Sequence, residues 1–337
     1  MSYAEVLTSL LVPRSDDGPL VLDLFAGSGG LALGFEAQGF QTWGFEQDAD
    51  CCMTYSHNLH GQCSQVTLTP QTDLPAASII IAGPPCQPFS VGGLQLGLSD
   101  TRDGFPSFIA AVEHLKPQLW LFENVRGLFY RNRWYLDAIL DQLRKSGPGY
   151  IVDVKLFRSA DYGVPQNRER IIVVGHLGGF RFPLPQKHRV TAGDALGLLA
   201  VDAPPNSKFL TPSMDAYVAR YEKASACVRP RDLHLDKPAR TLTTRNLAGA
   251  TGDMLRIRLP DGRRRRLTVR EAARLQSFPD WYEFSGTENS QFNQIGNAAP
   301  PLLAYHLARS VRNYLGLAPD ERDSSAGAAY LQPSLLF

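Results

Sequence analysis

With 337 residues, the chain is long enough for one large domain and a smaller second one. Its 44% hydrophobic and 20% charged residues are typical of a globular protein, and no run of about 18 apolar residues predicts a membrane span. Five cysteines without a C-x-x-C pair argue against a disulfide framework and a structural zinc site, so we expect no metal. The start of the chain lacks a basic segment, which predicts a cytoplasmic protein without a secretory signal.

The net charge of +1 hides an asymmetry between the two halves. Residues 1–150 carry 8 Lys+Arg against 15 Asp+Glu, whereas residues 151–337 carry 26 against 18. Only seven of the 34 cations are lysine. Arginine is preferred where forked donors meet phosphates or guanine edges, although a GC-rich genome also enriches it. The composition supports contact with nucleic acid without establishing it.

The first elements of the chain predict a nucleotide-binding unit. Residues 20–25 read as a strand, 26–30 as a glycine turn and 31–40 as a helix. Glu46 ends the strand-like stretch 41–45, roughly twenty residues after the turn, where a carboxylate can accept both ribose hydroxyls of an adenosine cofactor. These residues alone do not separate NAD from S-adenosylmethionine.

A candidate nucleophile follows the apolar run 78–82, which reads as a buried parallel strand. The next stretch, 83–90, has the sequence Gly-Pro-Pro-Cys-Gln-Pro-Phe-Ser, so prolines on both sides hold Cys86 on a stiff turn. The carboxyl end of a parallel strand is where open α/β sheets place their chemistry. A small core residue is the alternative reading of a free cysteine.

Candidate catalytic polar groups come later in the first half. The buried strand-like run 118–122 leads into Glu123, which is either a structural glutamate or a carboxyl that shares a proton with a substrate. Arg168 and Arg170 bracket a glutamate before the apolar run 171–175, and in an extended segment they would point to one side. Further helices are predicted over 48–58, 106–115, 134–145, 268–275 and 302–311, and a further strand over 151–157.

The composition changes at about residue 178, where proline-rich, linker-like stretches indicate the start of a second domain. Residues 240–246 and 254–259 look like strands with arginines on one face, followed by an Asp-Gly hairpin signal and the run 263–266 of four arginines. Such a run is often a solvated turn. Because other arginines are expected on one face of the neighbouring strands, we interpret the run as part of a face that contacts phosphates.

In this order, over about residues 20–315, the motifs resemble those of the DNA cytosine-C5 methyltransferases. The resemblance implies an α/β fold, with a Rossmann-like S-adenosylmethionine-dependent methyltransferase sheet and a second, smaller target-recognition domain. It implies a catalytic domain over 1–177, a target-recognition domain over 178–285, a segment 286–317 that completes the catalytic domain, and a disordered tail over 318–337. The segments that carry the resemblance are 23–30, 45–48, 83–90, 123–125, 166–170, 267–279 and 294–300.

The resemblance also assigns site residues. The catalytic ones are Cys86, Glu123, Arg168 and Arg170. S-adenosylmethionine would contact Phe25, Ala26, Gly27, Ser28, Gly29, Gly30, Glu46, Gln47, Gln65, Gly83, Pro85, Phe105, Asn297, Ala298 and Ala299. Gln65 stands where the family usually has an aspartate that contacts the adenine. DNA would contact Gln87, Ser90, Arg102, Arg240, Arg245, Asn246, Arg256, Arg258, Arg263, Arg264, Arg265 and Arg266.

The implied reaction transfers a methyl group from S-adenosylmethionine to C5 of a flipped cytosine in a specific duplex DNA sequence and leaves S-adenosylhomocysteine. Addition of the Cys86 thiolate at C6 makes C5 nucleophilic, while Glu123 at N3 and Arg170 at O2 withdraw charge from the ring. The base that removes the C5 proton is open, water included. We expect a monomeric, nucleoid-associated bacterial protein whose partner is double-stranded DNA. A cognate restriction endonuclease would share the target site without forming a stable complex.

Three alternatives remain. A tRNA cytosine-C5 methyltransferase could use the same catalytic domain, although the long arginine-rich insert and the lack of a Cys-Phe-Thr segment speak against it. A catalytically silent base-flipping protein would not need Cys86, Glu123 and Arg170 together. A cysteine hydrolase is disfavoured because no histidine accompanies the Cys86 loop in a motif.

Overall fold

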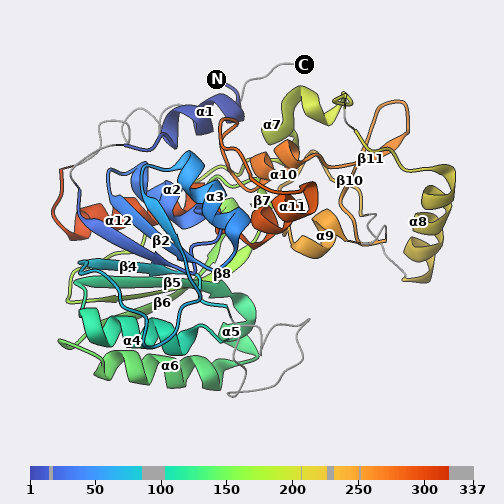
Figure 1. Cartoon of the computed structure of the whole chain (residues 1–337). Coiled ribbons are helices and arrows are strands. Elements are labelled where there is room, and N and C mark those ends of the chain that lie inside the picture. The colour runs from blue at the N-terminus through green and yellow to red at the C-terminus, as the bar shows by residue number, and fades with distance from the viewer. Residues whose placement is uncertain (15–17, 86–102, 206, 226–230, 250–251, 319–337) are drawn as a thin grey trace.

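The computed structural model describes residues 1–14, 18–85, 103–205, 207–225, 231–249 and 252–318 (Figure 1). A seven-stranded sheet forms its centre, with strand order β3-β2-β1-β4-β5-β8-β6. Strands β3 to β5 of this order are parallel, and β8 runs antiparallel to both β5 and β6. The bounds are β1 Leu20–Leu24, β2 Gln41–Glu46, β3 Gln62–Gln65, β4 Ile79–Ala82, β5 Leu119–Val125, β6 Ile151–Arg158 and β8 Glu169–His176.

Helices cover both faces of the sheet (Figure 1). One face carries α2 (Gly30–Glu36), α3 (Ala49–Asn58) and α12 (Pro301–Tyr314), and the other carries α4 (Phe105–Leu115) and α6 (Arg133–Lys145). Because helices bury the central strands on both sides, β4 is apolar throughout and β5 is apolar over its first four residues, rather than alternating. This arrangement confirms the predicted α/β sheet and the strand predicted over 78–82.

The closing helix α12 returns to the first helix of the chain's nucleotide-binding unit. It packs so closely on α2 that a Cβ added at Gly34 would lie 2.4 Å from the backbone nitrogen of Tyr305. The preceding helix, α11 (Glu288–Asn297), lies instead against α9 (Thr244–Ala248) and α10 (Val269–Leu275). One apolar cluster runs from Leu7 through Leu196 and Leu247 to Leu303, so it includes residues of each predicted domain. The domain boundaries stay a prediction.

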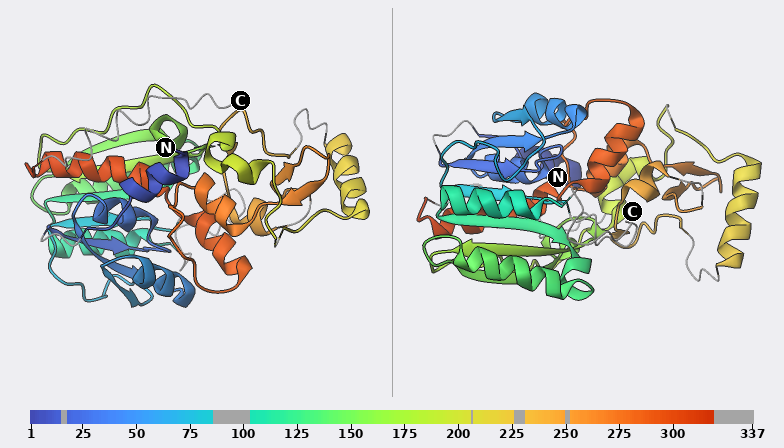
Figure 2. Two further views of the ribbon diagram at one scale, coloured as in Figure 1. Left: turned by 90° about the horizontal axis from the view of Figure 1, so that it is seen from above. Right: turned by 60° about the horizontal axis from the view of Figure 1, so that its bottom comes forward.

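A second group of elements lies beside the sheet, with α8 farthest from it (Figure 2). The hairpin of β10 and β11 is antiparallel, and its turn contains Gly262 at φ +85°, as the Asp-Gly signal predicts. Between β6 and β8 the chain forms η3 and the short strand β7, which pairs in parallel with β9 and so joins the two parts. The bounds are η3 Ser159–Tyr162, β7 Gln166–Asn167, α7 Ala192–Leu196, η4 Gly197–Ala200, α8 Pro212–Ala224, β9 Ala239–Arg240, α9 Thr244–Ala248, β10 Arg256–Arg258, β11 Arg264–Arg266 and α10 Val269–Leu275.

The strand predicted over 240–246 is wrong for most of its length. Only Ala239–Arg240 form a strand, and α9 begins at Thr244. The cause is a capping box: the Thr243 hydroxyl accepts from the Asn246 N–H while the Asn246 side chain accepts from the Thr243 N–H. A second capping box, predicted at Thr268, is present and starts α10.

Two short helices complete the description. Helix α1 spans Tyr3–Leu10, and α5 spans Arg126–Tyr130, directly after β5. Across the parts of the chain that the structure describes, every helix is too short or too polar to traverse a lipid bilayer.

Candidate active site

The glycine turn leaves β1 in left-handed backbone conformations that favour glycine. Gly27 and Gly29 have φ of +53° and +78°, and Phe25 has φ +58°. Glu46 reaches this turn from the end of β2. One of its carboxylate oxygens accepts from the Gly27 N–H at 2.9 Å, and the other accepts from the N–H groups of the next two residues at 2.8 and 2.9 Å. The carboxylate therefore ties the turn to the β2–α3 connection.

The residues of this turn fit an adenosine cofactor. A carboxylate has about four acceptor sites, so Glu46 keeps capacity for a hydroxyl donor. The buried Ser28 hydroxyl has no hydrogen-bond partner among the residues that the structure describes. The segment 297–299 lies against the turn, because a Cβ at Gly30 would be 2.3 Å from the Ala299 carbonyl oxygen. The predicted closing motif is thus brought to the glycine turn.

Other predicted cofactor residues gather at the carboxyl ends of neighbouring strands. Gln65 ends β3 opposite Glu46, and its side chain donates to the Gln47 carbonyl at 3.3 Å. Gly83 follows β4, and its N–H donates to the last residue of β1. Phe105 is fully buried, and its ring contacts those of Phe122 and Tyr135. The contact of each with the cofactor stays a prediction.

The predicted nucleophile Cys86 lies outside the described residues, as do Gln87, Ser90 and Arg102. The structure does describe the two residues before Cys86. The Asn124 side chain donates to the Pro84 carbonyl at 2.9 Å, and the Gly104 N–H donates to the Pro85 carbonyl at 3.1 Å. Asn124 therefore ties the end of β5 to the turn that leads into Cys86. The Glu-Asn-Val tripeptide predicts Glu123 as a site residue, and the contact of its neighbour Asn124 is evident only from the fold.

Glu123 and Arg170 face each other across the antiparallel pair of β5 and β8. Glu123 lies within β5 rather than after its end, because the pairing with β8 continues to Val125 opposite Arg170. The Arg170 Nε lies 2.7 Å from the Glu123 Oε1, and each side chain is only 12% exposed. The structure thus brings together two of the four predicted catalytic residues. A carboxyl and a guanidinium side by side can offer hydrogen bonds to adjacent atoms of one planar ring.

Arg168 has a different position from the one predicted. It is buried, and its guanidinium donates to the carbonyls of Leu242 and Gly296 at 2.8 and 3.2 Å. Burial, followed by the charge of Arg170, lowers the pKa of Arg168 well below its usual value. This position favours a structural role for Arg168, and its catalytic role stays a prediction. Arg168 holds together three segments that are distant in the sequence.

Two of the predicted DNA-contacting arginines are buried in ion pairs, which favours a structural role for both, and their contact with DNA stays a prediction. Arg256 pairs with Asp232 and Glu222, both at 3.0 Å, and Arg265 lies 2.7 Å from Glu271. Each has a side chain that is 0% exposed. The strand β11 turns Arg265 inward, so the four-arginine run is not a single phosphate-contacting face.

The remaining members of that run are less buried. Arg264 pairs with Asp215 and Asp232 at 3.4 and 3.2 Å and is mostly covered. Arg263 is exposed and pairs with Asp261, while the Arg266 guanidinium donates to the Leu247 carbonyl. Their contact with DNA stays a prediction.

The predicted base readers near α9 also differ from one another. Asn246 is buried, and its side-chain amide takes part in the α9 capping box and donates to the Thr241 carbonyl. These contacts favour a structural role, and its contact with a base stays a prediction. Arg245 has a side chain that is 79% exposed and an ion pair to Asp253 at 2.6 Å. Arg258 is exposed, and Arg240 donates to the Asp253 carbonyl. Arg245 and Arg258 keep their predicted role as candidates.

Replacing Arg265 with glutamine is expected to lower the free energy of unfolding by about 3–5 kcal/mol, because Glu271 would keep a buried charge without its partner. The same change at Arg263, in an exposed pair of the same run, should cost less than about 1 kcal/mol. Denaturant midpoints of the two variants check this. Equal midpoints would show that the Arg265–Glu271 pair does not hold the hairpin.

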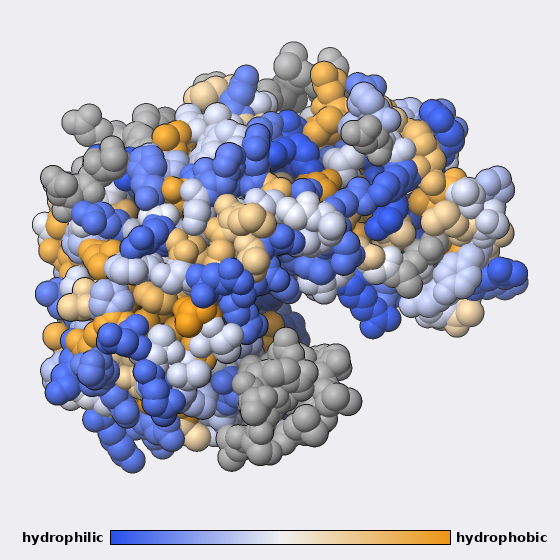
Figure 3. Space-filling view, viewed as in Figure 1, coloured by the Kyte–Doolittle hydropathy of each residue, from blue (hydrophilic) through white to orange (hydrophobic). Residues whose placement is uncertain are grey.

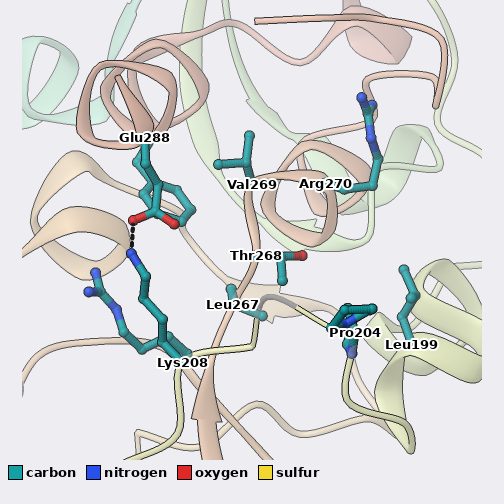
Figure 4. Close-up of a pocket in the computed structure, with 11 residues that line it drawn as sticks. Leu199, Pro204, Lys208, Leu267, Thr268, Val269, Arg270 and Glu288 are labelled. Atoms are coloured by element: carbon teal, nitrogen blue, oxygen red, sulfur yellow. Dashed lines mark hydrogen bonds and ion pairs between the residues drawn. The ribbon is translucent and has the colours of Figure 1, made fainter. Parts of the chain in front are cut away.

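Two cavities flank these residues. The larger, about 1000 Å³, is lined by Arg170 and by residues of α5 and of the segments around 158, 167, 189 and 241. The smaller, about 440 Å³, lies among the loop before Lys208, the start of α10 and α11 (Figure 4). An ion pair of Lys208 with Glu288 crosses it, and no predicted catalytic residue lines it. The larger cavity is therefore the candidate active-site entrance.

Comparison with known proteins agrees with this geometry. Residues 20–313 match the family model of the C-5 cytosine-specific DNA methylases. The chain is 55% identical to the Type II methyltransferase M.AplI of Arthrospira platensis, over 95% of this chain and 93% of that protein. It is 33% identical to the Type II methyltransferase M.NlaX of Neisseria lactamica, over 90% and 99%.

A solved structure shares the fold. The Entamoeba histolytica methyltransferase EhMeth aligns with a TM-score of 0.68 at 18% identity, over 89% of this chain and 99% of that one. The family match spans the glycine turn, Glu123, Arg170 and the closing motif alike. The chain therefore belongs to the family of C-5 cytosine-specific DNA methylases: it is a DNA (cytosine-5)-methyltransferase that uses S-adenosylmethionine.

Proposed function

We propose that this methyltransferase bonds Cys86 covalently to C6 of a cytosine flipped out of a specific duplex DNA sequence and methylates C5. The observation that carries the proposal is the Glu123–Arg170 pair, 2.7 Å apart and nearly covered. The side chain of Asn124, next to Glu123, donates a hydrogen bond to the turn that leads into Cys86. The turn that precedes Cys86 and the carboxylate of Glu123 are thus both held at the end of β5, with Arg170 on the neighbouring strand β8.

The chemistry explains why these groups are needed together. C5 of cytosine is a poor nucleophile, and addition of a thiolate at C6 converts the ring into an enamine whose C5 can attack. Glu123 would protonate or hydrogen-bond N3, while Arg170 would donate to O2, so that both withdraw charge as the thiolate adds. Loss of the C5 proton to a base then expels Cys86 and restores the aromatic ring.

The cofactor, when bound, supplies an electrophilic sulfonium methyl group. Glu46 would accept hydrogen bonds from the ribose hydroxyls, and the turn 26–30 would let the cofactor approach the backbone closely. The adenine would lie near Gln65, whose side-chain amide already faces the Gln47 carbonyl. None of these side chains needs to move a proton.

The proposed substrate is double-stranded DNA, and the relatives indicate its setting. M.AplI and M.NlaX are both Type II methyltransferases. We therefore propose that this protein acts as a monomer in the bacterial cytoplasm, on chromosomal DNA. It would protect a site that a cognate restriction endonuclease also recognises, without forming a stable complex with that endonuclease.

Transfer of labelled methyl from S-adenosylmethionine to duplex DNA, compared with transfer to tRNA, tests the proposal. Incorporation into DNA, mapped to one cytosine within a recurrent short sequence, is the expected result. Preferential labelling of tRNA would establish the rival methyltransferase. No labelling of either nucleic acid, together with retained DNA binding, would instead favour a silent base-flipping protein.

Replacing Arg245 with alanine is expected to relax the recognised sequence, at a cost of about 1–3 kcal/mol per lost base contact. The reason is that the Arg245 side chain, on α9, is 79% exposed and its ion pair with Asp253 lies at the surface. Arg263→Ala, which removes another exposed and ion-paired arginine, should weaken binding to all DNA while the methylated motif stays the same. Methylation maps of the two variants decide between them. A motif that changes only with Arg263→Ala would reverse the assignment.

A further inference from the structure

The larger cavity is lined mainly by positively charged side chains, although the base that would enter it is neutral. Besides Arg170, it is lined by Arg126, Arg131, Arg158 and Arg189, and Glu169 is the only carboxylate among its described lining residues. The surface is hollowed between the sheet and the part that contains α8 and α9 (Figure 3). Sequence reasoning named none of these four arginines, although Arg126 directly follows the Glu-Asn-Val tripeptide.

Glu169 holds two of these arginines at once. One of its carboxylate oxygens lies 2.5 Å from Arg126 Nη1, and the other lies 3.6 Å from Arg158 Nη2. The two guanidinium groups approach from different elements, since Arg126 begins α5 and Arg158 ends β6. The guanidinium groups of Arg126 and Arg158 therefore converge on the single carboxylate of Glu169.

These pairs differ from the buried pairs of the β10–β11 hairpin. The side chains of Arg126 and Arg158 are 63% and 45% exposed, whereas Arg256 and Arg265 are fully covered. Ion pairs that are open to water contribute little stability, so a different anion can replace the carboxylate at small cost. Arg126 and Arg158 are therefore free to exchange partners, whereas the buried Arg256 and Arg265 are not.

The chemistry of that point suits a phosphodiester. Arginine forks bind the paired oxygens of carboxylates and phosphates with the same geometry. An exposed aromatic ring lies beside the point, because Tyr130 lines the cavity and the Arg126 guanidinium stands 5.5 Å from its ring centre. Cations next to an exposed aromatic side chain are typical of surfaces that bind nucleic acid.

We propose that Arg126 and Arg158 bind one backbone phosphate of the target strand beside the flipped cytosine. Glu169 occupies that phosphate position until DNA arrives. The inference rests on the proposed function for the identity of the substrate, but its test does not depend on methyl transfer. Glu169 precedes Arg170 in β8 and both line the same cavity, so the phosphate site lies beside the catalytic pair. Phosphate capture would then fix the nucleotide whose base enters the active site.

The test measures binding of a fluorescein-labelled DNA duplex of about 30 base pairs and mixed sequence to the full chain, without cofactor, over a range of salt concentrations. The double variant Arg126→Gln/Arg158→Gln should bind roughly tenfold more weakly at 0.1 M salt, with a salt slope lower by about 0.9, as expected for one lost phosphate contact. Arg144→Gln is the matched control, since Arg144 is an exposed arginine paired within α6 and lies outside the cavity lining. Its binding should stay within about twofold of the unmodified chain.

Glu169→Gln separates phosphate mimicry from a structural role. Removal of the competing carboxylate should tighten DNA binding several-fold, the opposite sign to the arginine variants. Weaker binding by Glu169→Gln, or a double variant that behaves like Arg144→Gln, would overturn the inference. Either result can occur in a protein that still methylates DNA. Conversely, a chain that fails to methylate any DNA but shows the expected binding shifts would retain the phosphate site and lose the proposed function.

Discussion

Replacement of Cys86 by alanine should abolish both methyl transfer and the denaturant-resistant complex with DNA that carries 5-fluorocytosine. Fluorine at C5 blocks the proton loss that would release the enzyme, so the covalent bond between sulfur and C6 persists after methylation. The complex should form only when S-adenosylmethionine is present. Denaturing gel electrophoresis of the protein with labelled duplex DNA measures it directly.

Cys51→Ala is the matched control for this result. Cys51 is a free, half-buried cysteine on α3, and burial, aided by the charge of Glu46, raises the pKa of its thiol. A thiol that stays protonated is a poor nucleophile, so this variant should form the complex as the unmodified chain does. An undiminished complex in Cys86→Ala would exclude Cys86 as the nucleophile.

The sheet could be predicted because its signals are local. The run 79–82 is apolar at every position, since helices cover both faces of β4. The turn after β1 can be recognised from its closely spaced glycines. Glu46 could be found by its distance from that turn. Each of these inferences depends on residues that lie close together in the sequence.

Which arginines are buried and which are exposed could not be predicted, because their ion-pair partners lie elsewhere in the sequence and no local motif identifies them. Arg256 and Arg258 alternate with an apolar residue in the same short strand, yet Arg256 is buried and Arg258 is exposed. What separates them is the position of Asp232 and Glu222, 24 and 34 residues earlier in the chain. Spacing alone therefore cannot distinguish an arginine that holds the fold from one that meets DNA.

Arg168 shows the same limit at the active site. The sequence places it two residues from Arg170, and an extended backbone would direct both side chains to the same side. Instead β8 begins at Glu169, and the Arg168 guanidinium donates hydrogen bonds to the carbonyls of Leu242 and Gly296. Those carbonyls belong to segments that only the folded chain brings near, so no local pattern reveals the structural role.

Glu123→Gln should retain DNA binding while methylation slows by on the order of 10²-fold or more, the loss typical of a missing general acid. Glutamine keeps the size of the side chain and an oxygen toward Arg170, but it cannot share a proton with N3 of cytosine. Single-turnover methylation at saturating DNA and S-adenosylmethionine measures the chemical step.

A matched change elsewhere distinguishes this effect from the loss of a charge. Glu283 is an exposed glutamate that pairs with His57 of α3 at 3.3 Å and does not line the larger cavity, so Glu283→Gln should leave the single-turnover rate as it is. If Glu123→Gln methylates as fast as Glu283→Gln, then Glu123 only holds Arg170 in place. The Arg170 guanidinium at O2 would then have to supply most of the charge withdrawal, because it is the other polar group of the pair.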